Sequence, residues 1–122
     1  MNKNFYITTP IYYPSAKPHM GHAYSSILAD FFARIKKIMG FNVYFLTGTD
    51  EHGQKIQRAA EKLKKDPKIF CDEISKTFKD LSDILNLSNN DFIRTTEDRH
   101  KKSVTNLWNI LEKKNEIYLS KY

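Results

Sequence analysis

The first 47 residues of the 122-residue chain alternate between segments of strand and helix character. Residues 5–9 are aromatic and β-branched, which predicts a strand that is buried on both faces. Residues 19–39 carry apolar side chains at helical spacing, and Gly40 follows as a stop signal. Residues 41–47 predict a second strand. Strand, helix and strand in this order form a βαβ unit, so we expect an α/β fold with a parallel sheet flanked by helices.

The remainder of the chain predicts three further helices and a short third strand. We expect a helix at about 54–65, a second helix that begins at Asp66-Pro67, a strand at 92–94 and a last helix that starts within 95–98. Another extended segment is expected at 117–119. Apolar stripes should face the core, with Ile27, Leu28, Phe31, Phe32, Ile35, Ile38 and Met39 on the first helix and Val104, Leu107, Trp108 and Leu111 on the last.

Composition excludes several classes of protein. Apolar residues make up 40% and charged residues 28% of the chain, which is the balance of a folded domain and not of a disordered tail. The single cysteine, Cys71, excludes an internal disulfide framework and a cysteine-based zinc site. Because no apolar run approaches the roughly 18 residues of a membrane span and no leader pattern begins the chain, we expect one cytoplasmic domain over residues 1–122 without a membrane partner. The net charge of +6 suits either a phosphate-binding surface or lysines that only solvate helices.

The motif Pro18-His19-Met20-Gly21-His22 stands at the start of the first predicted helix. Since His19 and His22 are three residues apart, both rings are expected on one face of the first turn. Unpaired N–H groups at a helix start favour an anion, and two imidazole donors beside them would clamp a phosphate. Gly21 would let the ligand approach the backbone closely. The alternatives are a metal pair, for which further ligands are scarce, and simple capping of the helix.

A second polar block, Thr47-Gly48-Thr49-Asp50-Glu51-His52-Gly53, follows the second strand. Ligands of open α/β sheets bind outside the carboxyl ends of the strands, so this block and the loop 10–22 should open onto the same edge. That placement favours a ligand site over a solvated turn in which Asp50 or Glu51 only caps a helix. The pair Tyr12-Tyr13 in the first loop forms either a lid over the core or a wall for an apolar ligand side chain.

Several blocks of the sequence together resemble methionyl-tRNA synthetases, a family of class I aminoacyl-tRNA synthetases. They are residues 5–13, residues 18–24 with the H-x-G-H motif, residues 45–54 and residues 92–100. The resemblance covers essentially the whole chain in register, whereas H-x-G-H alone indicates only class I synthetases and related nucleotidyltransferases. It implies the N-terminal part of a Rossmann-like catalytic domain, truncated before the inserted domain.

The resemblance also implies an activity, substrates and residue roles. The activity is that of a methionine–tRNA ligase, which activates methionine with ATP to methionyl-adenylate and then transfers the methionyl group to tRNA(Met). Mg²⁺ would accompany ATP. The matching positions are His19, Gly21 and His22 for ATP, with the two histidines as the catalytic pair, and Ile11, Tyr13 and Asp50 for methionine. In this match the Ile11 backbone contacts methionine and Asp50 holds its ammonium group. A zinc site is not implied within this segment.

Other parts of the family pattern are not found in this sequence. They are the K-M-S-K-S loop, the rest of the methionine pocket, the inserted domain with its zinc knuckle, and the anticodon-binding domain. We therefore expect the isolated chain to be inactive, because groups that stabilise a transition state act as a unit. Two alternatives stay open, a non-catalytic half-domain that binds a nucleotide and a small nucleotidyltransferase with H-x-G-H. Residues 47–53 argue against the second.

Overall fold

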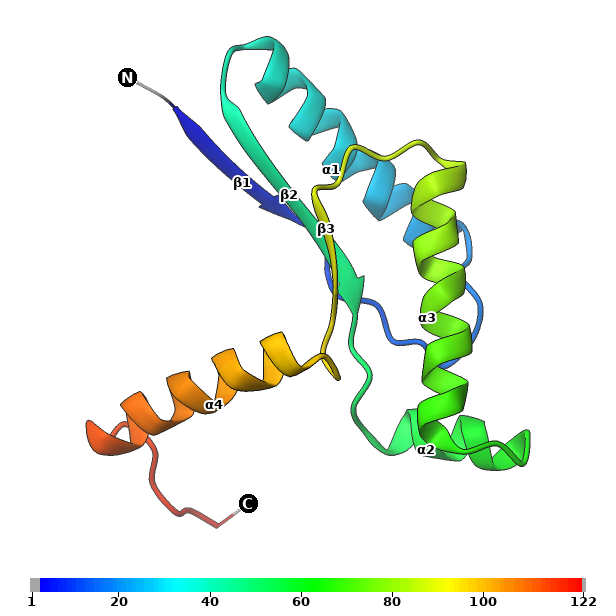
Figure 1. Cartoon of the computed structure of the whole chain (residues 1–122), viewed down its shortest axis with the longest axis vertical. Helices are drawn as coiled ribbons and strands as arrows, with labels where there is room; N and C mark the ends of the chain where they lie inside the picture. The colour runs from blue at the N-terminus through cyan, green and yellow to red at the C-terminus, as the bar shows by residue number, and fades with distance from the viewer. Residues whose placement is uncertain (1–2, 122) are drawn as a thin grey trace.

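A computed structural model of the chain describes residues 3–121, so residues 1, 2 and 122 of the expected domain lie outside the described part. The described residues form three strands and four helices (Figure 1). In chain order these elements are β1 (Asn4–Thr8), α1 (Met20–Ile38), β2 (Asn42–Thr49), α2 (Gln54–Lys62), α3 (Pro67–Ile84), β3 (Asp91–Arg94) and α4 (Asp98–Lys113).

The three strands form one parallel sheet in the order β1-β2-β3. Tyr6 of β1 pairs with Tyr44 of β2, and Thr47 of β2 pairs with Phe92 of β3. Parallel strands require crossover connections, which α1 provides between β1 and β2. The α/β fold with a parallel sheet and flanking helices is thus confirmed.

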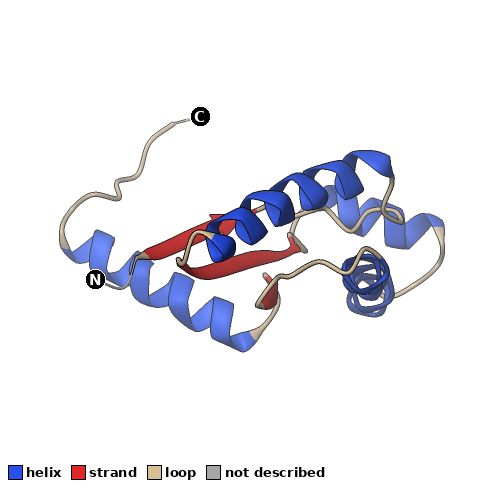
Figure 2. Ribbon diagram, turned by 90° about the horizontal axis from the view of Figure 1, so that it is seen from above, coloured by secondary structure: helices blue, strands red, loops and turns tan. Residues whose placement is uncertain are grey.

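One face of the sheet carries the core. Ala29 and Ala33 of α1 pack against Val43 and Phe45 of β2, and Phe45 is fully buried. The small alanine side chains let the helix backbone come close to the strands. α3 lies on the same side as α1, whereas α4 extends away from both helices (Figures 1 and 2).

The prediction that the first strand is buried on both faces is wrong. Tyr6 is 62% exposed and Tyr44 is 46% exposed on the uncovered face of the sheet, where their rings lie 6.0 Å apart. The predicted core stripe of α1 is wrong as well, because the helix contacts the sheet through Ala29 and Ala33. The large apolar side chains flank this contact, and most of them are exposed, namely Ile27, Leu28, Phe31, Phe32, Ile38 and Met39.

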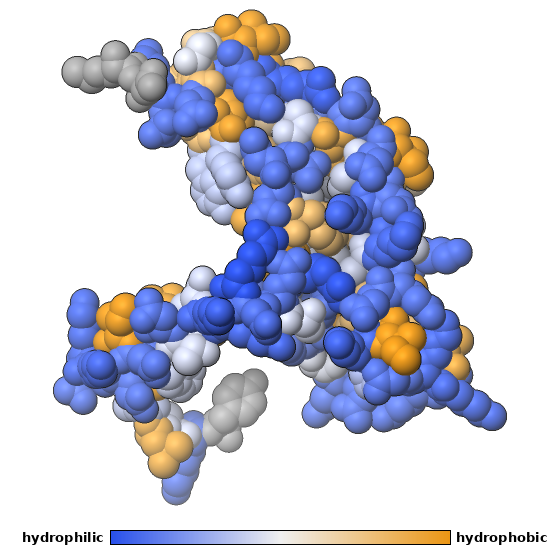
Figure 3. All heavy atoms as spheres, viewed as in Figure 1, coloured by the Kyte–Doolittle hydropathy of each residue, from blue (hydrophilic) through white to orange (hydrophobic). Residues whose placement is uncertain are grey.

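The predicted apolar face of the last helix has no partner within residues 3–121. No residue of α4 is buried, and Trp108, expected to pack in a core, is 54% exposed. Apolar side chains accordingly reach the surface along α4 (Figure 3). Residues 117–119, expected as an extended segment, have no regular secondary structure, and Leu119 is fully exposed.

The helix and strand ends follow local signals with two exceptions. The Asp66 side chain accepts hydrogen bonds from the backbone N–H groups of Lys68 and Ile69, so the predicted start of α3 at Asp66-Pro67 is confirmed. β2 is longer than predicted and ends at Thr49, because its last residues pair with β3. α2 ends at Lys62, three residues before the predicted position. No helix within residues 3–121 has both the length and the apolar character needed to cross a membrane.

Candidate functional site

The loop after β1 and the turn after β2 meet at the carboxyl edge of the sheet. The Tyr12 N–H donates to the Gly48 carbonyl at 3.0 Å, and the Asp50 N–H donates to the Tyr12 carbonyl at 2.9 Å. Tyr12 thereby forms an isolated parallel bridge with Thr49. The expectation that both loops share one edge is confirmed. The polar block differs from the prediction in that Gly48 and Thr49 belong to β2.

His19 and His22 cap α1 reciprocally. The Gly21 N–H donates to Nδ1 of His19 at 3.1 Å, and the His19 N–H donates to Nδ1 of His22 at 3.0 Å. This is a capping box built from two imidazoles, where Ser or Thr with Glu or Gln is usual. The ring centroids lie 3.9 Å apart, so both rings share one face of the first turn, as predicted.

The capping contacts fix which ring nitrogens remain free for a ligand. A ring nitrogen that accepts a hydrogen bond carries no proton, so a neutral ring that accepts through Nδ1 has its proton on Nε2. His19 and His22 can therefore each donate an Nε2–H to a ligand. The expectation that bare backbone N–H groups attract the anion is wrong for His19, Gly21 and His22, since all three already donate within the motif.

A side chain at Gly21 would crowd the His19 ring that caps the helix. A Cβ atom at this position would lie 3.0 Å from Cε1 and 3.2 Å from Nδ1 of His19. Both distances are shorter than ordinary van der Waals contact, and the second atom is the acceptor of the Gly21 N–H. The structure thus gives Gly21 a role in seating the His19 ring, beside the predicted close approach of a ligand.

His22 lies in an aromatic corner. Its ring meets Tyr12 edge to face with centroids 4.9 Å apart and meets Phe78 of α3 in the same way at 5.0 Å. Burial in this corner, together with the neighbouring His19 ring, lowers the pKa of His22 below 6.5. His22 is therefore held in its neutral form, which is the form that the cap needs.

A cavity of about 310 Å³ lies beside the two histidines. Its lining combines aromatic, imidazole, hydroxyl and ammonium groups, from residues Ile11, Tyr12, Tyr13, Ser15, Ala16, Lys17, His19, His22 and Lys55. Four of the six residues predicted for the site, Ile11, Tyr13, His19 and His22, therefore face one cavity. The two tyrosines take different roles, since Tyr12 is buried and hydrogen-bonded to Ser26 whereas Tyr13 is 52% exposed.

Asp50 does not line this cavity, although it lies next to Tyr12 in space. Its backbone N–H is held by the Tyr12 carbonyl, and its side chain is partly buried. Within residues 3–121 the Asp50 carboxylate makes no hydrogen bond or ion pair. A carboxylate with a fixed backbone and no internal partner is available for a cationic ligand group.

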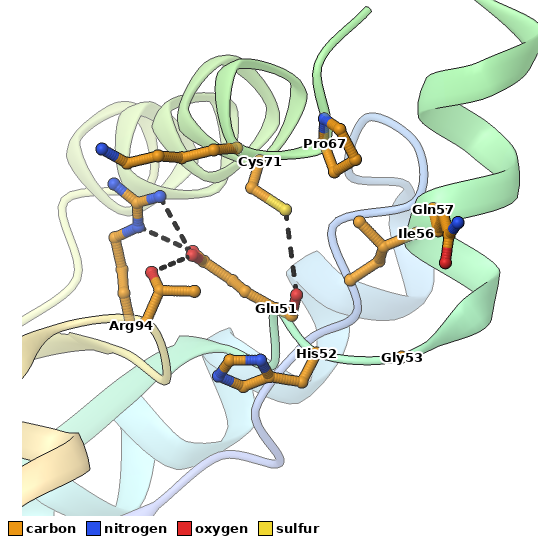
Figure 4. Close-up of a pocket in the computed structure, with 10 residues that line it drawn as sticks. Glu51, His52, Gly53, Ile56, Gln57, Pro67, Cys71 and Arg94 are labelled. Carbon is orange, nitrogen blue, oxygen red and sulfur yellow. Dashed lines mark hydrogen bonds and ion pairs between the residues drawn. The ribbon is translucent and has the colours of Figure 1, made fainter.

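Sequence reasoning missed a second group of residues, which gathers around Glu51 and His52 of the same turn. Glu51, His52, Cys71, Arg94 and Thr96 line a cavity of about 280 Å³ together with residues of α2 and α3 (Figure 4). The available signal was Glu51 beside two threonines in the polar block. Its partner Arg94 lies 43 residues away, and no local pattern connects them.

Cys71 is buried among apolar residues of α2 and α3, where it packs as a small hydrophobic side chain. Burial and the nearby Glu51 carboxylate raise the pKa of its thiol to about 11. Cys71 is therefore protonated and unreactive at neutral pH. Among the described residues no group of three or more His, Cys, Asp and Glu side chains is placed to hold a metal ion.

The chain is similar to methionine–tRNA ligases over nearly its whole length. The family described as tRNA synthetases class I (M) matches residues 5–122. Methionine–tRNA ligase 1 of Bacillus cereus is 54% identical over 121 residues, which are 99% of this chain and 18% of that protein. The mitochondrial methionine–tRNA ligase of Takifugu rubripes is 52% identical over 99% of this chain and 20% of that protein. The chain therefore spans about a fifth of the length of these relatives.

A solved structure also shows similarity to methionyl-tRNA synthetases. Mycobacterium tuberculosis methionyl-tRNA synthetase in complex with methionyl-adenylate is 41% identical, with a TM-score of 0.95 over 98% of this chain and 24% of that chain. The arrangement of strands and helices described above is thus that of the corresponding part of this synthetase.

Proposed function

Because this chain belongs to the class I tRNA synthetases of the methionyl family, we propose that it forms the part of a methionine–tRNA ligase in which ATP and methionine meet. The single observation that carries the proposal is the paired capping of His19 and His22, which leaves two Nε2–H donors beside one cavity. The relative from Mycobacterium tuberculosis binds methionyl-adenylate, which contains both substrates' parts.

In the proposed reaction the methionine carboxylate attacks the α-phosphate of ATP and releases pyrophosphate. The protein mainly positions the reactants and stabilises developing charge. The Nε2–H groups of His19 and His22 donate to phosphate oxygens, and Lys17 and Lys55 add positive charge to the same cavity. Because both rings are fixed through Nδ1, these donors need no reorganisation during the reaction.

Methionine is proposed to bind at Ile11, Tyr13 and Asp50. Ile11 and Tyr13 line the cavity of the two histidines, and the Asp50 carboxylate lacks a partner among residues 3–121. That carboxylate would hold the ammonium group through a charge-assisted hydrogen bond, and the exposed Tyr13 ring would pack against the thioether side chain. Transfer of the methionyl group to tRNA(Met) is the proposed second step of the whole ligase.

Mg²⁺ enters this proposal only as a companion of ATP. Proteins hold Mg²⁺ through carboxylates together with substrate phosphates. The described residues that line the histidine cavity offer imidazole, ammonium and hydroxyl groups but no carboxylate. They do not fit the ion by themselves, and we assign no step to it.

Methionine-dependent ATP–pyrophosphate exchange by the complete gene product tests the proposal. We expect Asp50→Ala to raise the KM for methionine by about 10- to 100-fold, since a lost charge-assisted bond costs about 1.5–3 kcal/mol. The KM for ATP should change less than about twofold, and Asp83→Ala on the exposed side of α3 serves as the control. Absence of methionine-dependent exchange in the wild type would overturn the proposal. An equal loss for ATP would move Asp50 to the nucleotide side.

A further inference from the structure

The Glu51 side chain is fully buried at the carboxyl edge of the sheet. Its carboxylate accepts hydrogen bonds from the hydroxyl groups of Thr49, Ser75 and Thr96 and from the guanidinium of Arg94. Burial alone would raise the pKa of Glu51, but these hydrogen bonds outweigh it and hold the pKa below 4.5. Glu51 is therefore an ionised carboxylate with its charge satisfied inside the protein.

Arg94 makes this network an anchor between distant elements. It is the last residue of β3, and its Nε and Nη2 donate to the two carboxylate oxygens of Glu51 at 2.6 and 2.9 Å (Figure 4). The same Nη2 also donates to Asp72 on α3. A bidentate guanidinium–carboxylate pair restricts both distance and orientation. The turn after β2 is thus tied to β3 and to α3 at one point.

Further hydrogen bonds hold the backbone on both sides of Asp50, next to the anchored Glu51 side chain. The Glu51 N–H donates to the Thr95 hydroxyl at 2.8 Å, and the His52 ring contacts the Thr95 carbonyl at 3.3 Å. On the other side, the Asp50 N–H donates to the Tyr12 carbonyl. The turn is therefore held from both sides, while the Asp50 carboxylate itself has no partner in the described part of the chain.

We propose that Glu51 and Arg94 form a clamp, fully buried at Glu51 and partly buried at Arg94, that positions Asp50 for the amino-acid substrate, so that Glu51 is a positioning residue and makes no contact with substrate. This inference rests on the proposed function of Asp50. A buried ion pair is a weak source of stability, because desolvation of both charges offsets their attraction and apolar replacements often fold equally well. Here the pair holds Glu51 in one orientation and thereby fixes the position of Asp50, the residue next to it. A misplacement of about 1 Å can lower a reaction rate by about 10²-fold.

The test compares three variants of the complete gene product in ATP–pyrophosphate exchange. Glu51→Gln keeps the shape of the side chain and removes its charge. We expect kcat/KM for methionine to fall roughly 10- to 100-fold while the KM for ATP stays within about twofold. Glu73→Gln, which alters the exposed ion pair between Glu73 of α3 and Lys65 just before that helix, is the matched control and should leave both parameters unchanged.

A double variant, Glu51→Gln with Arg94→Met, separates positioning from stability. The double variant removes both charges, so its melting temperature should lie closer to that of the wild type than the melting temperature of Glu51→Gln does. Its kcat/KM for methionine should stay as low as that of Glu51→Gln. Recovery of kcat/KM together with the melting temperature would overturn the proposal, and so would an unchanged kcat/KM in folded Glu51→Gln. If Glu51→Gln does not fold, Arg94→Lys keeps the charge but loses the bidentate geometry, and the same criteria apply to it.

The outcomes also distinguish this inference from the proposed function. A methionine effect in Asp50→Ala without one in Glu51→Gln would overturn the clamp alone. A wild-type protein without methionine-dependent exchange would overturn both.

Discussion

The His19 and His22 rings both cap the start of α1 through their Nδ1 atoms. His22 accepts from the His19 N–H and His19 accepts from the Gly21 N–H, and the ring centroids lie 3.9 Å apart. This relationship unites two interpretations of the H-x-G-H motif that the sequence leaves as alternatives. The Nδ1 atoms serve the backbone as caps, and the Nε2 atoms remain available to a ligand. Variants that separate the two nitrogens should therefore separate stability from activity.

The first prediction uses the different positions of the polar atoms in Asn and Gln. His19→Asn keeps a capping acceptor at the N-cap, and His22→Gln places the usual capping-box residue at the third helical position. The free energy of unfolding of both variants should lie within about 0.5 kcal/mol of the wild-type value. His19→Ala and His22→Ala should each lower it by about 1 kcal/mol. Chemical denaturation of the four variants measures this.

Activity should follow a different order in the same variants. His19→Asn lacks the Nε2 donor and should lower the rate of adenylate formation by about 10²–10³-fold despite its intact cap. Stopped-flow measurement on the complete gene product decides the point. A near-normal rate for His19→Asn would mean that His19 acts only as a cap.

The second prediction concerns pH. The pKa of His22 is lowered in the fold from 6.5, so the unfolded chain binds the proton at a higher pH than the folded chain does. The stabilising contribution of neutral His22 is therefore complete above pH 6.5 and declines as the pH falls toward the folded-state pKa. Protonation of Nδ1 would also place a hydrogen against the His19 N–H.

Unfolding free energies at a series of pH values between 5 and 8 test this sign. The wild type should lose stability more steeply below pH 6.5 than His22→Gln, which carries no titrating group at that position. Parallel curves for the two proteins would show that His22 does not titrate differently in the folded and unfolded states.

The third prediction concerns Gly48 in the middle of the sheet. A Cβ atom there would overlap the Ile93 carbonyl oxygen and lie 2.9 Å from its carbonyl carbon. Since both are backbone atoms of the neighbouring strand, they cannot move aside without disturbing the β2–β3 pairing. Gly48→Ala should therefore lower the free energy of unfolding by about 3 kcal/mol or more.

Gly40→Ala is the informative control for that variant. No described residue lies within 4 Å of a Cβ at Gly40, but its φ of +81° is in the left-handed region. Backbone strain in Gly40→Ala should therefore lower the free energy of unfolding by only about 1–2 kcal/mol. Similar melting temperatures for Gly48→Ala and Gly40→Ala would contradict the steric argument.

Features that rest on neighbouring residues could be predicted from the sequence. The strand–helix–strand order follows from periodicity, the start of α3 follows from Asp66 and Pro67, and the shared face of His19 and His22 follows from a spacing of three. Each depends on interactions within one or two turns of chain, so the residue pattern contains the whole cause.

Features that rest on distant partners were decided only by the tertiary structure. The sequence does not indicate that α1 contacts the sheet through Ala29 and Ala33 and leaves Phe31 and Phe32 exposed, because an apolar stripe does not name the surface that covers it. Nor does it show that Glu51 meets Arg94, which is 43 residues away. Such a pair forms only once the β2–β3 pairing and the packing of α3 have closed the loops between them, and no local preference encodes that closure.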